Sequence, residues 1–383
     1  MSVVDDVVHA KEGYFNNLRI GSTAKASSAS PTQIVVSQDN TGDYQGSTHT
    51  AIQSAITYAI ANSIGKVFIK RGTYTISTKL TCNGHLIIEG EGPEFTELKA
   101  GNSFNGNMLE INSTQSASTH YRVVFRDIKF DGNHTNQTTG SCVVSYGGIQ
   151  GEFFHCHFEN FYNYGLHLWD CQGGSGAFGH HNQIIDCLFD QGETSAGEGI
   201  GLYIRNNDEN SIISSQFQYN KIGIKDESGF NQITSCAFVD GEVGVYVLDS
   251  SRTRINSCIF DYCARQGIHL KAPFNLVNGC TFYRCSDGSS TYDCLYIDYY
   301  GHNLISNNVF VAENSSNKTR TAIYEDGNNA EDTEGNNMIL GNFFLSTSTS
   351  TTMQGSSNWS HASGGLFYVN SDNTLANNID SVS

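Results

Sequence analysis

The chain has 383 residues and a formal net charge of −17, and it contains 39 glycines but only 3 prolines. Excess negative charge argues against a duplex nucleic-acid partner, because such binding depends on neutralising phosphates. No run of apolar residues approaches the roughly 18 that a membrane-spanning helix needs. We therefore expect a protein that neither binds nucleic acid nor inserts into a membrane, built from short elements joined by many turns.

The first 46 residues show neither a helix nor a repeat, and the stretch YFNNLRIGSTAKASSASPTQIVV is β-prone and rich in Ser and Ala. We expect residues 1–46 to form an extended N-terminal segment. Its start, MSVVDDVVHAKEGYF, lacks the charged and apolar regions of a classical signal peptide.

The stretch THTAIQSAITYAIANSIGK at residues 48–66 predicts one helix over about 48–64. Thr48 is the expected N-cap and Gly65 the expected stop. One apolar stripe at helical spacing consists of Ile52, Ala55, Ile56, Ala59 and Ile60. We expect this helix to cover the open end of a stack of strands. The unpaired backbone groups of an uncovered end strand could otherwise pair with another chain.

A ten-residue pattern then recurs, as NQITSCAFVD at 231, TRINSCIFDY at 253, NLVNGCTFYR at 275 and NLISNNVFVA at 303. Alternate residues such as Thr234, Cys236 and Phe238 share one parity, as in a strand. The closing phenylalanines lie 21 to 34 residues apart and are Phe130, Phe158, Phe189, Phe217, Phe238, Phe260, Phe282, Phe310 and Phe344. A period of this length without room for a helix predicts a solenoid of stacked coils.

A second short strand follows each repeat, as in GLHLW at 165–169 and GVYVL at 244–248. Each coil therefore has at least two strands. We predict an all-β fold, a single-stranded parallel β-helix over residues 47–346, followed by a Ser/Thr-rich loop and a closing strand in residues 347–383.

Two other residue types recur at fixed places in the repeat. Five cysteines stand two residues before the closing Phe and are expected to form one interior column of small apolar side chains: Cys156, Cys187, Cys236, Cys258 and Cys280. Asparagines open the repeats, where we expect them to adopt the left-handed turn and to bond their neighbours in the stack: Asn182, Asn210, Asn231, Asn275 and Asn303. No residues show metal-ligand spacing, so neither a metal nor another cofactor is expected.

The segments TAIQSAI, VFIKRGTYTI and IIEGEG resemble the entry to the pectate-lyase-like right-handed parallel β-helix superfamily, which includes carbohydrate-active tailspikes of viruses and phages. The resemblance covers about residues 34–345 and implies a right-handed helix. The motifs of polygalacturonases and pectate lyases are absent, and of the pectin-esterase motif only GTY at 72–74 is present. The resemblance therefore implies a carbohydrate-related function without naming a reaction.

Residues 1–46 are also similar to the thin attachment segments of viral tail fibres and spikes, although an ordinary flexible terminus is the alternative. The similarity implies a virion protein that is extracellular or virion-associated without a classical signal peptide. By the same analogy we expect a homotrimer.

The second strands should point alternate residues outward, toward solvent. The outward pairs are His167/Trp169, Tyr203/Arg205, Lys225/Glu227, Tyr246/Leu248, His269/Lys271, Tyr296/Asp298 and Tyr324/Asp326. Seven strands at about 4.8 Å form a strip of roughly 30 Å, which suits a polysaccharide or cell-surface glycan. Ring faces would contact pyranoses, and the cations would contact carboxylates or hydroxyls. The alternative is that these residues are cross-strand pairs that stabilise the sheet.

Asp298 and Asp326 occupy equivalent positions on successive coils. One strand spacing of about 5 Å matches the carboxylate separation of a retaining glycosidase. Glu325 is a further candidate if its strand ends early, and Lys271 beside Asp298 could instead act as the base of a lyase. Two solvated surface aspartates are the non-catalytic alternative. The sequence thus leaves a polysaccharide hydrolase, a lyase and a non-catalytic adhesion spike open.

Overall fold

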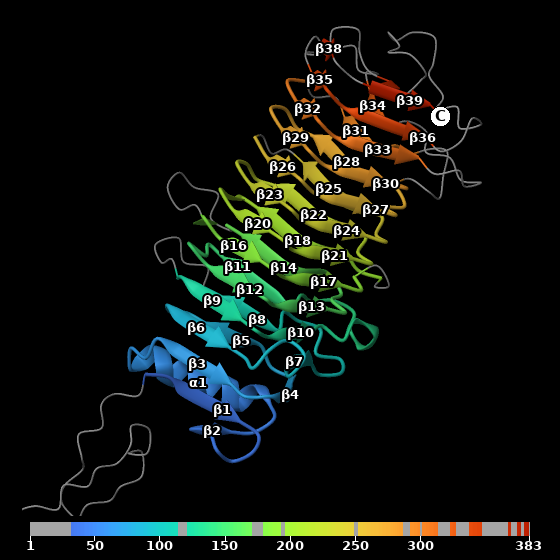
Figure 1. The fold of residues 1–383 in the computed structure, drawn as a ribbon. Coiled ribbons are helices and arrows are strands. Elements are labelled where there is room, and N and C mark those ends of the chain that lie inside the picture. The colour runs from blue at the N-terminus through green and yellow to red at the C-terminus, as the bar shows by residue number, and fades with distance from the viewer. Residues whose placement is uncertain are drawn as a thin grey trace, which may run out of the picture.

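The computed structural model describes residues 32–113, 121–170, 179–192, 196–248, 252–285, 292–298, 301–312, 322–326 and 337–346, and three short strands beyond them. The described strands stack into a long rod whose walls are three parallel sheets (Figure 1). Each coil contributes one strand to each sheet before the chain rises to the next coil. The predicted parallel β-helix is therefore confirmed, with three strands a coil.

The sheets are named here by their strand numbers. The 14-stranded sheet comprises, in order, β2 (Tyr44–Gln45), β1 (Ile34–Ser37), β3 (Lys66–Ile69), β6 (Leu86–Glu89), β9 (Val123–Arg126), β12 (Glu152–Phe154), β16 (Gln183–Ile185), β20 (Ser211–Ile213), β23 (Gln232–Thr234), β26 (Arg254–Asn256), β29 (Leu276–Asn278), β32 (Leu304–Ser306), β35 (Met338–Leu340) and β38 (Thr374–Ala376). The 12-stranded sheet comprises β4 (Gly72–Ile76), β7 (Thr96–Ala100), β10 (Lys129–Asp131), β13 (His157–Glu159), β17 (Leu188–Asp190), β21 (Gln216–Gln218), β24 (Ala237–Val239), β27 (Ile259–Asp261), β30 (Thr281–Tyr283), β33 (Val309–Ala312), β36 (Phe343–Ser346) and β39 (Ile379–Val382). The 11-stranded sheet comprises β5 (Leu80–Cys82), β8 (Leu109–Ile111), β11 (Val143–Tyr146), β14 (Tyr164–Trp169), β18 (Ile200–Arg205), β22 (Ile222–Glu227), β25 (Val243–Leu248), β28 (Gln266–Lys271), β31 (Leu295–Asp298), β34 (Ile323–Asp326) and β37 (Phe367–Tyr368). A small pair, β15 (Gly179–His180) and β19 (Asn207–Asp208), and a 3-10 turn, η2 (His134–Asn136), lie outside these sheets.

The ten-residue repeat is two strands rather than one. In NQITSCAFVD, β23 ends at Thr234 and β24 begins at Ala237, and Ser235 between them has a left-handed φ of 55°. This turn reverses the parity, so Ile233 and Phe238 both point inward and are buried, although their numbers differ by five. The alternation expected through the whole repeat therefore fails at the turn.

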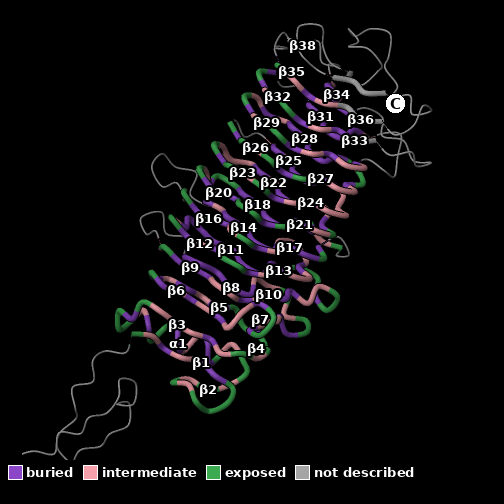
Figure 2. Tube along the Cα trace, viewed as in Figure 1, coloured by how far each residue is buried: buried purple, intermediate pink, exposed green. Residues whose placement is uncertain are grey.

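Buried columns fill the rod, as the purple inner positions of the strands show (Figure 2). The phenylalanines of the 12-stranded sheet stack from Phe130 to Phe310, with neighbouring ring centroids 4.6 to 5.2 Å apart. Offset stacking of this kind adds roughly 0.5–1.5 kcal/mol per pair beyond the burial itself. The repeat of Phe in the sequence thus reflects packing between coils.

The cysteine column is also confirmed. All ten cysteines in the described residues are buried, including Cys156, Cys187, Cys236, Cys258 and Cys280. Burial raises the pKa of the Cys142 and Cys156 thiols well above the ordinary value, so they stay uncharged. Ser215 and Asn308 take the same place in other coils and accept bonds from the Cys187 and Cys280 backbone N–H groups.

The asparagines form a ladder, but not in the conformation expected. The Oδ1 of Asn210 accepts a 3.1 Å bond from the backbone N–H of Asn182, and the Oδ1 of Asn231 accepts one of 2.9 Å from the N–H of Asn210. The left-handed residue is the one before each asparagine, such as Glu209 (φ 57°) or Phe230 (φ 59°). The asparagine itself does not adopt a left-handed conformation. Its side-chain hydrogen bonds therefore explain why asparagine recurs at this position.

A buried carboxylate replaces the ladder where it is interrupted. Thr253 stands in the asparagine position, and Asp226 is fully buried on the inner side of β22. Its carboxylate accepts bonds from the Asn231 amide (2.9 Å), the Thr253 hydroxyl (2.7 Å) and the Ser228 backbone N–H (3.0 Å). Burial raises the pKa of Asp226, while these bonds oppose the shift.

The two ends of the rod differ. Helix α1 (His49–Ala61) covers the N-terminal end and buries Ala51, Ile52, Ala55, Ile56 and Ala59 against the first coil, as predicted. Thr48 is its N-cap residue, but its side chain makes no capping bond. None of the helices in the described residues is both long and apolar enough to cross a membrane.

The stack begins before the expected boundary at residue 47. Strand β1 pairs with β3 in parallel, so residues 34–37 are part of the first coil and not of an attachment segment. The predicted segment otherwise lies largely outside the described residues, as does most of 347–383. Within that C-terminal part, β37, β38 and β39 add one strand to each sheet, and the predicted closing strand GGLFYVN contains β37.

Glycines at the start of the 11-stranded sheet's strands make room for the Phe column. A Cβ at Gly244 would lie 2.6 Å from Cδ1 of Phe260 and 2.5 Å from the Gly267 carbonyl oxygen. We predict that Gly244→Ala lowers the free energy of unfolding by about 1–3 kcal/mol, because a packed interior does not absorb an extra methyl group. The thermal midpoint measures the loss. Gly65→Ala is the control, since a Cβ there meets nothing within 4 Å, and equal effects of the two changes would contradict the packing argument.

Candidate functional site

The outer side of the 11-stranded sheet places the predicted strip residues in two vertical columns. The first column is His167, Tyr203, Lys225, Tyr246, His269, Tyr296 and Tyr324, each the direct partner of the next. The second contains the in-register pairs Trp169/Arg205, Arg205/Glu227, Leu248/Lys271 and Asp298/Asp326. The structure thus brings all the predicted strip residues onto one face, which we call the strip. His167, Tyr203 and Asp298 are nevertheless buried and not turned to solvent as expected.

Most rings of the strip lie face to face with each other. His167 and Tyr203 stack at 4.6 Å, Tyr246 and His269 at 4.5 Å, and Tyr296 and Tyr324 at 5.5 Å. These stacked faces are not available to pyranose rings, contrary to the expected mode of binding. The strip therefore offers sugars ring edges and hydroxyl groups, whereas the Nε2 atoms of His167 and His269 are buried.

The N-terminal half of the strip is a paired network. Glu227 accepts a 2.6 Å bond from the Tyr203 hydroxyl, and its carboxylate lies 2.7 Å from the Lys225 ammonium. Burial alone would raise the pKa of Glu227, but these bonds outweigh it and lower the pKa. Arg205 lies 3.7 Å from the same carboxylate and 5.5 Å from the centre of the Trp169 ring. The expected alternative of cross-strand pairing describes this half well.

The C-terminal half holds the carboxylate pair. Asp298 and Asp326 are direct partners on β31 and β34, so their Cα atoms are about 5 Å apart. The Tyr296 hydroxyl donates a 2.9 Å bond to Oδ2 of Asp326. The Oδ2 of Asp298 lies 3.6 Å from Nε2 of His269 and 3.6 Å from Nζ of Lys271. This is the one level of the strip where two carboxylates are adjacent.

Glu325 does not belong to this pair. Strand β34 continues to Asp326, so the condition for Glu325, an early strand end, is not met. Glu325 is buried on the inner side, where its Oε1 accepts a 3.0 Å bond from the Asn337 amide. It is a second inward carboxylate, comparable to Asp226.

Burial keeps the strip's imidazoles neutral. It lowers the pKa of His269 to about 4, with Lys271 adding to the shift. It lowers the pKa of His167 to about 3, with Arg205 adding to the shift. Burial, together with the bond to Asp326, raises the pKa of Tyr296. At neutral pH the strip therefore presents neutral imidazole and phenol groups beside Lys271 and Asp298.

A cavity of about 590 Å³ opens beside the middle of the strip. Tyr246 and His269 form its strip side, and the first residues of β22, β25 and β28 (Ile222, Val243 and Gln266) also line it. Residues of the turns that enter the 11-stranded sheet form the rest: Asn163, Ala196, Gly197, Glu198, Lys221, Glu242, Arg265 and Tyr292. Its volume lies within the range of about 300–1,000 Å³ typical of small-ligand sites. The turn residues were missed in the sequence because they lie outside the repeating strands. The charged and aromatic residues of those turns were the available signal.

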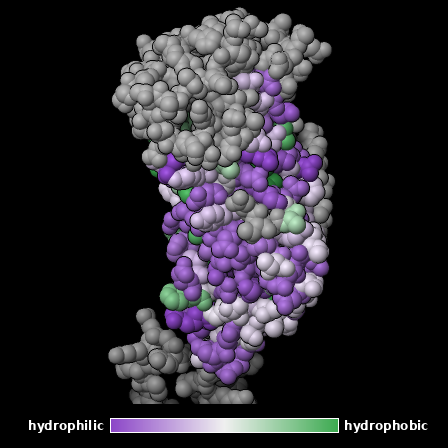
Figure 3. All heavy atoms as spheres, turned by 90° about the vertical axis from the view of Figure 1, so that its right-hand side faces the viewer, coloured by the Kyte–Doolittle hydropathy of each residue, from purple (hydrophilic) through white to green (hydrophobic). Residues whose placement is uncertain are grey.

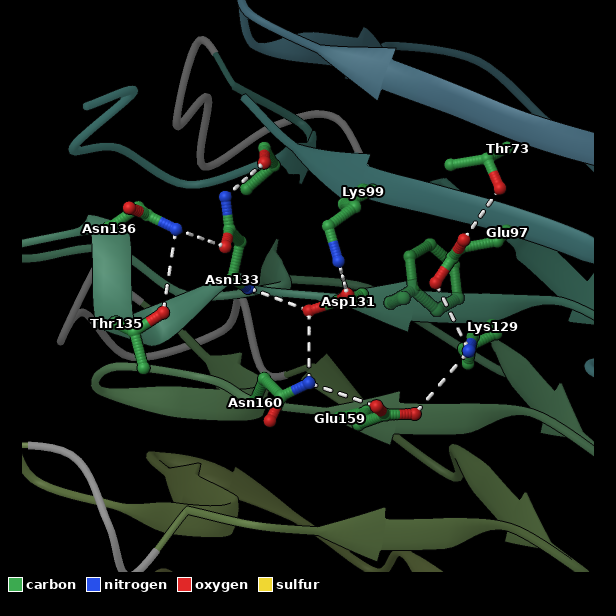
Figure 4. A network of polar contacts seen from close by, with 12 residues as sticks. Thr73, Glu97, Lys99, Lys129, Asp131, Asn133, Thr135, Asn136, Glu159 and Asn160 are labelled. Carbon is green, nitrogen blue, oxygen red and sulfur yellow. Dashed lines mark hydrogen bonds and ion pairs between the residues drawn. The ribbon is translucent and has the colours of Figure 1, made fainter. Parts of the chain in front are cut away.

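A second polar cluster lies on the 12-stranded sheet but is a poor candidate site. It joins Thr73, Glu97, Lys99, Lys129, Asp131, Asn133, Glu159 and Asn160 across four strands and their turns (Figure 4). Lys129 lies 3.1 Å from Glu97 and 3.5 Å from Glu159, and Lys99 pairs with Asp131. Carboxylates and cations thus satisfy each other, as stabilising cross-strand pairs do.

The side of the rod around the 12-stranded sheet is mainly hydrophilic, with apolar residues scattered over it (Figure 3). Exposed Ile259 on β27 is one such residue. No large apolar patch gathers among the coloured residues of that view. The strip and its cavity are therefore the stronger candidate.

Comparison with solved structures supports the architecture. The A-module of mannuronan C-5 epimerase AlgE4 from Azotobacter vinelandii superposes with a TM-score of 0.66 and 14% identity, covering 91% of this chain and 98% of that one. The chain is a right-handed parallel β-helix. The DFA-IIIase of Arthrobacter chlorophenolicus A6 without its lid gives a TM-score of 0.63 and 14% identity, with 89% and 94% coverage. The N-terminal fragment of bacteriophage Phi29 gene product 12 gives 0.58 and 11%, with 76% and 59% coverage. At these identities the likeness shows the fold alone.

Sequence comparison identifies no family that covers half of the chain or more. Residues 225–370 of this β-helix match the family described as periplasmic copper-binding protein (NosD), which is less than half of the chain. No curated protein matches the sequence. Among the residues that the structure describes, no group of three or more His, Cys, Asp or Glu side chains could hold a metal ion.

The neutral state of His167 leads to a pH prediction. Its folded pKa of about 3 lies below the unfolded value of roughly 6.5, so its contribution to stability is complete above pH 6.5 and is lost as the pH falls toward 3. His167→Phe keeps a ring but removes the titration. We expect the melting temperature of the wild type, relative to this variant, to decline as the pH is lowered from 7 to 4. A difference that stays constant over that range would contradict a buried neutral imidazole.

Proposed function

We propose that this β-helix binds a polysaccharide along the strip and cleaves it by hydrolysis between Asp298 and Asp326. The observation that carries the proposal is the in-register carboxylate pair at the end of a continuous polar face with a cavity beside it. Carboxyl groups about 5–5.5 Å apart are the arrangement of retaining glycosidases, in which one protonates the leaving oxygen and the other attacks. The epimerase and DFA-IIIase named above have the same fold, which makes carbohydrate chemistry on such a scaffold plausible.

In this proposal the other strip residues position the chain. The Tyr296 hydroxyl orients Asp326 through its 2.9 Å bond. Lys271 pairs with Asp298 of the neighbouring strand, and neutral His269 lies 3.6 Å from the same carboxylate. The N-terminal half, from His167 and Trp169 to Glu227, and Tyr324 at the other end would contact further sugar units through ring edges and hydroxyl groups.

The lyase alternative is weaker. Lys271 is the base that it would use, but the Lys271 ammonium lies 3.6 Å from the Asp298 carboxylate. A neighbouring carboxylate favours the protonated ammonium, which cannot accept a proton.

A non-catalytic, receptor-binding spike is the second candidate. It is favoured by Asp298, which is only 8% exposed and is flanked by Lys271 and His269, as in a structural ion pair. In that case the strip binds a cell-surface glycan without cleaving it.

The two carboxylates separate these functions. We expect Asp298→Asn and Asp326→Asn each to reduce the release of reducing ends from the cognate polysaccharide by about 100-fold or more, because each removes one of two required acid–base groups. Asp240→Asn, in a half-buried turn that follows β24 of the 12-stranded sheet, is the control. Wild-type protein that releases no reducing ends from a broad glycan panel, yet is retained on a glycan column, would favour the spike.

We further propose that the protein acts outside the cell as part of a virion and that it forms a homotrimer. The similarity of residues 1–46 to viral attachment segments supports this, and the likeness to the Phi29 protein is compatible with it. Light scattering of the full chain should give three times the mass of one chain. A monomer over the accessible concentration range would contradict the trimer.

A further inference from the structure

The cavity beside the strip is joined to the carboxylate pair through one residue. His269 lines the cavity, and its Nε2 lies 3.6 Å from Oδ2 of Asp298. A ligand in the cavity would therefore be next to the level at which we propose cleavage. What the cavity recognises would then determine the class of polysaccharide, an inference that rests on the proposed function.

The cations of this region are already engaged. Arg265 lies 3.3 Å from Glu242, and the Lys221 ammonium donates a 2.7 Å bond to the carbonyl oxygen of Gly197. On the strip, Arg205 and Lys225 share Glu227, and Lys271 pairs with Asp298. Each cation of the cavity and the strip thus has an acceptor within the protein. None of them needs a carboxylate from the ligand.

Negative groups also line the cavity. Glu198 and Glu242 both contribute to its wall, and the chain as a whole has a net charge of −17. Lys221 and Arg265 balance these two carboxylates, so the wall offers a uronic acid no net positive charge, and its carboxylate would compete with Glu242 for Arg265. Sugar hydroxyls, which both donate and accept, can bond to Glu242, Arg265, Gln266 and the neutral His269 without disturbing the pairs.

We propose that the cavity binds one uncharged glycosyl residue, so that the protein selects a neutral polysaccharide and rejects polyuronates. Tyr246 and Tyr292 supply aromatic surface, and the paired charges supply donors and acceptors of fixed orientation. The selectivity comes from charge pairing and not from the shape of the fold, because the epimerase of similar fold is named for mannuronan.

The test is calorimetric binding of the full chain to two sets of hexasaccharides. The neutral set is cellohexaose, mannohexaose, xylohexaose and maltohexaose, supplemented by an array of neutral bacterial glycans, and the acidic set is oligomannuronate and oligogalacturonate. We expect at least one neutral probe to bind about tenfold more tightly than either acidic probe, with little dependence on salt. Tighter binding of an acidic probe, weakening steeply with salt, would overturn the proposal, as would the absence of any neutral ligand.

Two variants locate the binding. Ala196 is exposed and lines the cavity, so Ala196→Trp should fill it and weaken neutral binding by about tenfold. Ile259→Trp, at an exposed site on the 12-stranded sheet, is the matched control. Glu242→Gln releases Arg265 from its carboxylate and should increase the affinity for oligomannuronate. Unchanged affinities in both cavity variants would show that the cavity is not the site.

The outcomes separate this inference from the proposed function. If the polysaccharide is bound and cleaved normally by Ala196→Trp, the cavity proposal fails and the strip proposal stands. If the wild type binds a neutral glycan in the cavity but Asp298→Asn and Asp326→Asn change no reaction, cleavage fails and the cavity proposal stands.

Discussion

Direct stacking of one coil on the next is the constraint on which the structure depends. Parallel backbone bonds between successive coils join residues 21 to 44 positions apart, and they leave no freedom for one coil to slip relative to its neighbour without exposing its apolar side chains. Equal residues therefore meet across levels, whether they are Phe rings, cysteine thiols or asparagine amides. The same strand register aligns inward and outward side chains, so the outer columns are as regular as those of the core.

Regularity outside has a chemical consequence. Because the strip's rings meet face to face, the register that gathers them also removes those faces from solvent. What remains is a row of polar edges, and most charges in it are compensated within the protein. This pattern changes at one level, where β31 and β34 bring two carboxylates together.

Much of this could be predicted from the sequence, because side chains that repeat at one place in the coil report the register directly. The Phe and Cys columns, α1 and the alignment of Asp298 with Asp326 follow from that rule. Parity alone could not reveal the left-handed turn at Ser235, where a conformation open to several residue types splits one apparent strand into two. The Glu242–Arg265 pair could not be predicted for another reason. Both residues lie in turns, and the turns differ in length from coil to coil, so their sequence shows no repeat from which contacts can be inferred.

Those unequal turns point to how such a rod can change. The turn between β23 and β24 has only two residues, exposed Ser235 and buried Cys236. The chain between β17 and β18, in contrast, is several residues longer than that between β21 and β22 without disturbing the pairing of either sheet. Evolution could thus lengthen, shorten or exchange the cavity's wall while the scaffold stays intact. Changes in the turns would then alter ligand preference, while the stacked strands would keep the fold.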